Sequence, residues 1–184
     1  MGDAPDGVRP HPSQLRAMAN VEYRGMNLVI PDNDSEWREH FKLARGHRLM
    51  LRACGSCRLM RYPPSHGCPW CGALEWTWQP VSGGGHIYSY EIVAHAIQPG
   101  FRDWTPDPVV LVELDEQRGA PTPDEALRVI ANLVTPDFGP EREDRVGIGK
   151  RVRVVFHDLS DDFALPQFTL TDEPPIGRVW SLPA

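Results

Sequence analysis

The sequence lacks long apolar runs and has no excess of basic residues. None of its apolar runs approaches the ~20 residues that a membrane-spanning helix needs, and its N-terminus is polar and interrupted by proline, unlike a signal peptide. Lysine and arginine number 19 against 25 aspartate and glutamate, a formal net charge of −6, whereas domains that bind nucleic-acid phosphates are normally basic. We therefore expect a cytoplasmic protein that does not act at a membrane or on nucleic acid.

The sequence also lacks internal repeats and recognisable catalytic motifs, and none of its seven histidines lies in a nucleophile or metal-hydrolase motif. Helix-breaking residues are common instead, with 19 prolines and 16 glycines among 184 residues. So many breakers disfavour a helical bundle and favour short strands joined by turns. Apolar residues make up 41% of the chain, enough for a packed core. The expected fold class is mainly β.

Cysteine is scarce, and the four cysteines lie close together in the pattern C-x2-C-x10-C-x2-C. They are Cys54, Cys57, Cys68 and Cys71. Two such pairs can surround one metal ion tetrahedrally, since each C-x2-C turn places two sulfurs on the same side. Disulfides would need an oxidising compartment, and a redox dithiol needs only one pair. We predict a structural zinc site, with rubredoxin-like iron as the alternative.

The order of patterns along the chain predicts an arm, a helix with a zinc ribbon, a barrel and a tail, over residues 1–34, 35–80, 81–175 and 176–184. The helix is predicted over 35–45, because Trp37, Phe41 and Ala44 form one apolar stripe at helical spacing. This stripe packs on its own domain or, in a second interpretation, inserts into the groove of a partner.

Five strands are predicted after residue 81, which fits a five-stranded barrel of the OB type. The first is long, and its apolar even positions, beginning at Tyr88 and Tyr90, predict one inward face. The expected strands cover residues 86–97, 109–114, 128–134, 150–157 and 165–170. A charged segment over 137–147 is expected to form a loop or a helical turn.

Several of these motifs occur together in the DUF35 family, which the sequence resembles over about residues 36–170. The matching segments are Leu49-Met50-Leu51-Arg52-Ala53-Cys54-Gly55-Ser56-Cys57, Arg61-Tyr62-Pro63-Pro64, Cys68-Pro69-Trp70-Cys71-Gly72, Trp76-Thr77-Trp78 and Ile87-Tyr88-Ser89-Tyr90. The resemblance implies an N-terminal helix, a rubredoxin-like zinc ribbon and an OB-fold. It also implies a small partner of a thiolase-like protein, in a hetero-oligomer that binds an acyl-CoA thioester while the partner carries out the thiolase or aldolase chemistry.

Seven residues are candidates for contacting acyl-CoA or the partner. Phe101 and Trp104 suit an interface, and Arg102 between them suits a phosphate, although the two rings could equally cover the mouth of the barrel. Arg58 and Arg61 are further phosphate candidates, with exposed, solvated side chains as the alternative. The stripe residues Trp37 and Phe41 complete the set.

Two other functions are weighed against this one. A single-stranded nucleic-acid-binding protein is the main alternative, since zinc ribbons and OB-folds both serve that purpose, but the acidic charge disfavours it. An independent enzyme is disfavoured because no catalytic constellation is recognisable and a metal would occupy all four cysteines.

Overall fold

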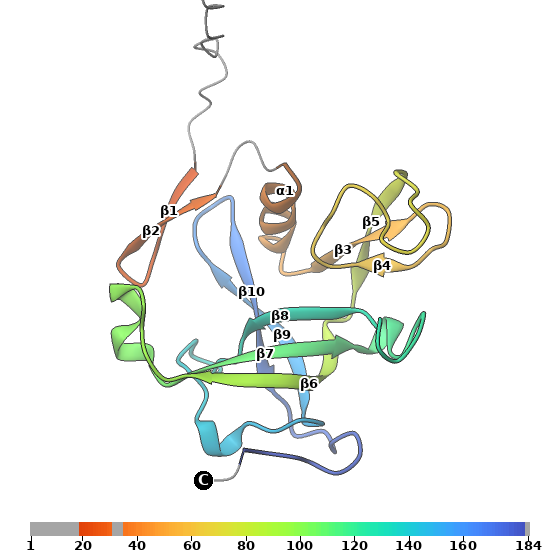
Figure 1. Cartoon of the computed structure of the whole chain (residues 1–184). Helices are drawn as coiled ribbons and strands as arrows, with labels where there is room; N and C mark the ends of the chain where they lie inside the picture. The colour runs from red at the N-terminus through yellow and green to blue at the C-terminus, as the bar shows by residue number, and fades with distance from the viewer. Residues whose placement is uncertain (1–18, 31–34, 183–184) are drawn as a thin grey trace, which may run out of the picture.

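The structure, a computed structural model, describes residues 19–30 and 35–182 (Figure 1). In this part of the chain a β-hairpin precedes one α-helix, a three-stranded sheet and a five-stranded sheet. Strands dominate, as the composition predicts. No helix among these residues is long and apolar enough to cross a membrane.

The hairpin consists of β1 (Ala19–Tyr23) and β2 (Met26–Ile30), which pair in an antiparallel register. Arg24 and Gly25 form its two-residue turn with φ values of +54° and +71°, as a type I′ turn requires. This hairpin lies within the predicted N-terminal arm, and the rest of that arm lies outside the described residues. It is followed by α1 (Ser35–Ala44), which confirms the predicted helix.

Three strands carry the segment that contains the cysteines. The central strand β3 (Leu49–Cys54) pairs in antiparallel fashion with β4 (Met60–Arg61) on one side and β5 (Trp76–Val81) on the other. β3 leads into the first cysteine pair and β5 follows the second, so the two strands flank the segment that carries the cysteines.

All five predicted strands of the barrel are present, in the spatial order β10–β9–β6–β7–β8. They are β6 (Gly84–Val93), β7 (Asp107–Leu114), β8 (Arg128–Asn132), β9 (Arg151–Asp158) and β10 (Ala164–Leu170). A parallel bridge between Leu133 and Phe168 nearly closes the sheet. Short 3-10 helices lie in its connections: η2 (Pro99–Trp104), η3 (Asp115–Gln117) and η4 (Glu143–Arg145).

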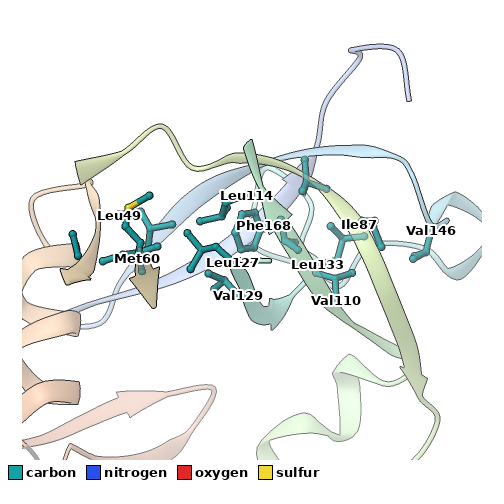
Figure 2. Packing of buried hydrophobic residues seen from close by; sticks show 14 residues of the cluster. Leu49, Met60, Ile87, Val110, Leu114, Leu127, Val129, Leu133, Val146 and Phe168 are labelled. Carbon is teal, nitrogen blue, oxygen red and sulfur yellow. The ribbon is translucent and has the colours of Figure 1, made fainter. Parts of the chain in front are cut away.

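The hydrophobic core extends from the barrel into the ribbon sheet (Figure 2). Ile87, Val110 and Phe168 are fully buried inside the barrel. Leu49 of β3 and Met60 of β4 belong to the same cluster. The ribbon and the barrel, predicted as consecutive units, therefore share one core, which fixes the metal-binding loops relative to the barrel. The helix α1 packs beside them, against β3 and β10.

The prediction that Tyr88 points inward with Tyr90 is wrong. The register between β6 and β7 shifts between Ile87 and Ser89, so Tyr88 occupies a β-bulge and is 39% exposed. One extra residue reverses the alternation of inward and outward side chains. Ile87 is the buried residue before the bulge, and Tyr90 packs against the core after it.

The turn of the hairpin packs closely against η2, and this contact needs a glycine. A Cβ on Gly100 would lie 2.5 Å from the Arg24 carbonyl oxygen and 2.6 Å from Met26 Cγ. We expect Gly100→Ala to displace the hairpin and leave the barrel folded, so that hydrogen exchange becomes faster in β1 and β2 alone. Gly67→Ala is the control, since its Cβ would meet no atom closer than 3.8 Å. Unchanged hairpin protection in Gly100→Ala would contradict this description.

Candidate metal centre and binding surfaces

The four cysteines converge at one end of the ribbon sheet. Cys54 ends β3 and Cys57 lies in the turn before β4, while Cys68 and Cys71 lie in the loop before β5. All four sulfur atoms lie within 4.8 Å of one another, with Cys54 Sγ 3.6 Å from Cys71 Sγ and Cys57 Sγ 3.5 Å from Cys68 Sγ. Sulfurs bound tetrahedrally to zinc at about 2.3 Å are about 3.8 Å apart. The cluster therefore fits a tetrahedral metal ion.

The backbone around the cluster favours thiolates over thiols. The Ser56 amide donates to Cys54 Sγ at 3.4 Å, and hydrogen bonding from the Cys57 backbone lowers the pKa of the Cys54 thiol to about 6. Gly72, which follows the last cysteine, has a φ of +74°, a conformation that glycine adopts without strain. Four thiolates would saturate a zinc ion and leave no open position for substrate, so the metal would be structural.

Two buried arginines support the loop that carries Cys68. Arg52 donates to the carbonyl oxygens of Pro64 and Ser65 at 3.1 and 3.2 Å, and Arg61 donates to those of Ser65 and His66 at 2.9 Å each. Arg61 is only 2% exposed, so its predicted role as a phosphate ligand would require it to leave these carbonyls.

Two other residues of this loop region, the candidate Arg58 and also His66, lie at the surface. Arg58 is exposed in the turn between Cys57 and β4. His66, whose side chain is 83% exposed, pairs with Glu36 of α1 at 2.6 Å and is not part of the cysteine cluster.

The predicted contact residues Phe101 and Trp104 pack against the hairpin of their own chain. The guanidinium carbon of Arg24 lies 3.0 Å from the centre of the Trp104 ring and 4.7 Å from that of Phe101. The Arg24 side chain is 4% exposed and lies 3.9 Å from the carboxylate of Asp107. Arg102 alone of the predicted three is exposed. Their contact with a partner or with acyl-CoA stays a prediction.

Trp37 and Phe41 lie half-buried on the side of α1 that faces the barrel. Their rings stack with centroids 5.8 Å apart, and Trp37 meets Tyr62 edge to face at 5.6 Å. Both line a cavity of about 270 Å³ between α1, β8 and β10. The stripe thus packs on its own domain, the first of the two interpretations.

His40 is buried among these rings, and burial lowers its pKa to about 4. In the unfolded chain His40 therefore takes up a proton as the pH falls through about 6.5, whereas in the folded chain it does so only near pH 4. The free energy of unfolding consequently falls as the pH falls through this interval. We expect His40 to account for a loss of about 2 kcal/mol between about pH 7 and pH 5. Urea unfolding should show a flatter pH dependence in His40→Phe than in His95→Phe, a control at an exposed position. Parallel profiles would contradict the assignment.

An apolar surface that the sequence does not single out lies on the outside of the barrel. We call it the outer sheet face; it consists of Tyr88, Val109, Leu111 and Ile130. Ile130 is 57% exposed and lies opposite Leu111 in the register of β7 and β8. Tyr88 packs under the guanidinium of Arg128 at 3.5 Å. Tyr88 and Ile130 are exposed, and Val109 and Leu111 are half-buried; neighbouring apolar side chains at the surface are often found at interaction sites.

Comparison with known proteins supports the same fold. The family model of the C-terminal OB-fold domain of ChsH2 matches residues 78–157. A protein of Thermomonospora curvata named "Probable enoyl-CoA hydratase alpha subunit" is 32% identical over 128 residues, which cover 70% of this chain and 35% of the relative. The chain thus spans about a third of the length of that relative.

A solved structure matches a similar share of the chain. It is the "Ltp2-ChsH2(DUF35) aldolase", which is 29% identical with a TM-score of 0.59 and matches 77% of this chain and 96% of that one. The family model thus covers most of the barrel, and the solved structure matches most of the chain. The chain belongs to the DUF35 family.

Proposed function

We propose that this chain is a non-catalytic, zinc-containing subunit of an acyl-CoA enzyme, and that a thiolase-like partner carries the reacting groups. The observation that carries the proposal is the sequence and structural likeness to a DUF35 chain of an aldolase. The second relative is named as a subunit of an enoyl-CoA hydratase. Both names link chains of this kind to multi-subunit enzymes, and one of them to acyl-CoA chemistry.

The chemistry of the described residues supports a binding role rather than a catalytic one. The cysteines are gathered in one cluster, where a metal would occupy every thiolate that could act as a nucleophile. The histidines with a hydrogen-bond partner bind carboxylates or backbone atoms: His47 binds Asp158, His66 binds Glu36 and His95 binds Ala94. None of these three bonds joins a histidine to a hydroxyl or thiol group that could act as a nucleophile.

The chain's own contribution would be to hold and shape the partner's site. The four thiolates would bind zinc, which supplies folding energy to the ribbon. Because the ribbon and the barrel share one core, the metal would stabilise the barrel as well. The outer sheet face of the barrel would give the partner an apolar surface to pack against. Arg58 and Arg102, both exposed, are free to contact the phosphates of a CoA thioester, which arginine binds through charge-assisted hydrogen bonds.

The test is to compare acyl-CoA turnover by the purified chain with turnover by the complex isolated from the native host through the same tagged chain. We expect no turnover by the chain alone and cleavage, condensation or hydration of acyl-CoA by the complex. Turnover by the chain alone would overturn the proposal. Salt-sensitive binding of a single-stranded oligonucleotide would favour the nucleic-acid alternative instead.

A further inference from the structure

The four cysteines of the cluster differ in how close they lie to solvent. Cys71 is exposed, whereas Cys57 is half-buried and Cys54 and Cys68 are each 3% exposed. A Cβ on the residue after Cys71, Gly72, would meet no atom within 4 Å, so the chain beside Cys71 is not covered by another segment. Because a cysteine reacts with a dissolved molecule only where that molecule can reach it, Cys71 is the member of the cluster that an oxidant meets first.

The hydrogen bonds at the cluster also leave Cys71 less protected than Cys54. The Ser56 amide donates to Cys54 Sγ at 3.4 Å, and such a bond withdraws electron density from a thiolate and makes it a weaker nucleophile. In the described part of the chain, the structure shows no amide that donates to Cys71 Sγ. Exposure and hydrogen bonding therefore single out the same sulfur.

A second sulfur lies close enough to Cys71 to complete an oxidation. Cys54 Sγ is 3.6 Å from Cys71 Sγ, so the two sulfurs would have to approach by about 1.5 Å to reach the length of a disulfide bond. Cys54 ends β3 and is held by the sheet, whereas Cys71 lies in an exposed turn between β4 and β5. Cys71 is therefore the one of the two that is free to move.

We propose that Cys71 is a site of oxidation by hydroperoxides and that Cys54 then closes a disulfide with it. The Cys71 thiolate attacks one oxygen of hydrogen peroxide, so that an S–O bond forms, the O–O bond breaks and hydroxide leaves. The Cys54 thiolate then attacks the Cys71 sulfur, an S–S bond forms and a second hydroxide leaves. Two protons from solvent convert both hydroxides to water, and two electrons pass from the sulfurs to the peroxide.

This oxidation would make the fold of the ribbon depend on the redox state of its surroundings. The disulfide removes two of the four thiolates, and the remaining pair, Cys57 and Cys68, holds zinc poorly. Because Leu49 and Met60 of the ribbon belong to the core of the barrel, the whole chain would lose stability. The inference rests on the zinc site and not on the proposed partner.

Limited treatment of the full-length, zinc-loaded chain with hydrogen peroxide tests the chemistry. We expect zinc release, followed with a chromophoric chelator, to accompany a Cys54–Cys71 disulfide, mapped by mass spectrometry after the free thiols are alkylated. A first disulfide between any other two cysteines would overturn the proposal, and so would zinc retained by four free thiols. A chain that holds no zinc before peroxide is added would overturn both the proposal and the assignment of the metal.

A matched pair of variants tests the assignment to Cys71. Cys71→His removes the attacked sulfur and Cys57→His removes a sulfur outside the reacting pair, and both keep three cysteines and one histidine, a set that occurs in structural zinc sites. We expect peroxide to release zinc about tenfold more slowly from Cys71→His than from the wild type, since the exposed nucleophile is gone. Cys57→His should release it at the wild-type rate. Equal rates for the two variants would contradict the proposal, and the wild-type disulfide map decides the matter if either variant fails to bind zinc.

Discussion

Cys57→Ser is expected to lose the metal and to unfold the ribbon. Three thiolates and a hydroxyl hold zinc poorly, and a structural zinc site supplies on the order of 10 kcal/mol of folding free energy. Because the ribbon strands contribute Leu49 and Met60 to the barrel core, the thermal midpoint of the whole chain should fall as well. Metal analysis and calorimetry measure both effects.

Ser56→Ala is the matched control, because residue 56 lies in the same turn and only its backbone amide contacts a cysteine sulfur. This variant should retain one zinc per chain, the stoichiometry expected for four thiolates, and a wild-type midpoint. A wild-type chain that is fully folded without any metal would contradict the assignment of the cluster.

The second large effect is expected at the outer sheet face. Ile130→Asp would place a charge at the most exposed side chain of the apolar surface, and a buried, unpaired charge within an interface strongly opposes association. We expect the affinity for the acyl-CoA enzyme partner to fall a few hundredfold, about 3.5 kcal/mol, with little change in the thermal midpoint because Ile130 is 57% exposed.

Val29→Asp is the comparison for this variant. Val29 lies on the hairpin, away from the outer sheet face, and is 49% exposed. Val29→Asp therefore introduces the same charge at a similarly exposed apolar position. Its partner affinity should match that of the wild type. Equal affinities for Ile130→Asp and Val29→Asp would show that the partner does not bind at the outer sheet face.

The metal cluster could be predicted from the sequence because its information is local. Each C-x2-C pair fixes two sulfurs within one turn, and only the meeting of the two pairs depends on the fold. The strands of the barrel could also be predicted from the sequence, since alternating apolar residues define a buried face wherever the register is regular. The bulge at Tyr88 marks the limit of this reasoning, because its position depends on pairing with β7 and not on the pattern of β6 itself.

The surfaces were harder to predict because they depend on contacts between distant segments. Nothing in the sequence around Arg24 indicates that its guanidinium packs on Trp104 of η2. Arginine is normally exposed, and yet Arg61 is buried because the carbonyls of the loop that follows it accept its hydrogen bonds. The outward position of Ile130 could be predicted, since it follows the buried Val129 in a strand. A single outward isoleucine does not predict an apolar surface, however, until the fold places Leu111 and Tyr88 beside it.

The central claim is that this chain works as a subunit of an acyl-CoA enzyme, and native mass spectrometry of the tagged chain purified from its host tests it most directly. We expect a hetero-oligomer whose second subunit has the sequence of a thiolase-like protein, with one zinc ion for each copy of this chain. A chain that is recovered only by itself, or only with nucleic acid, would contradict the claim.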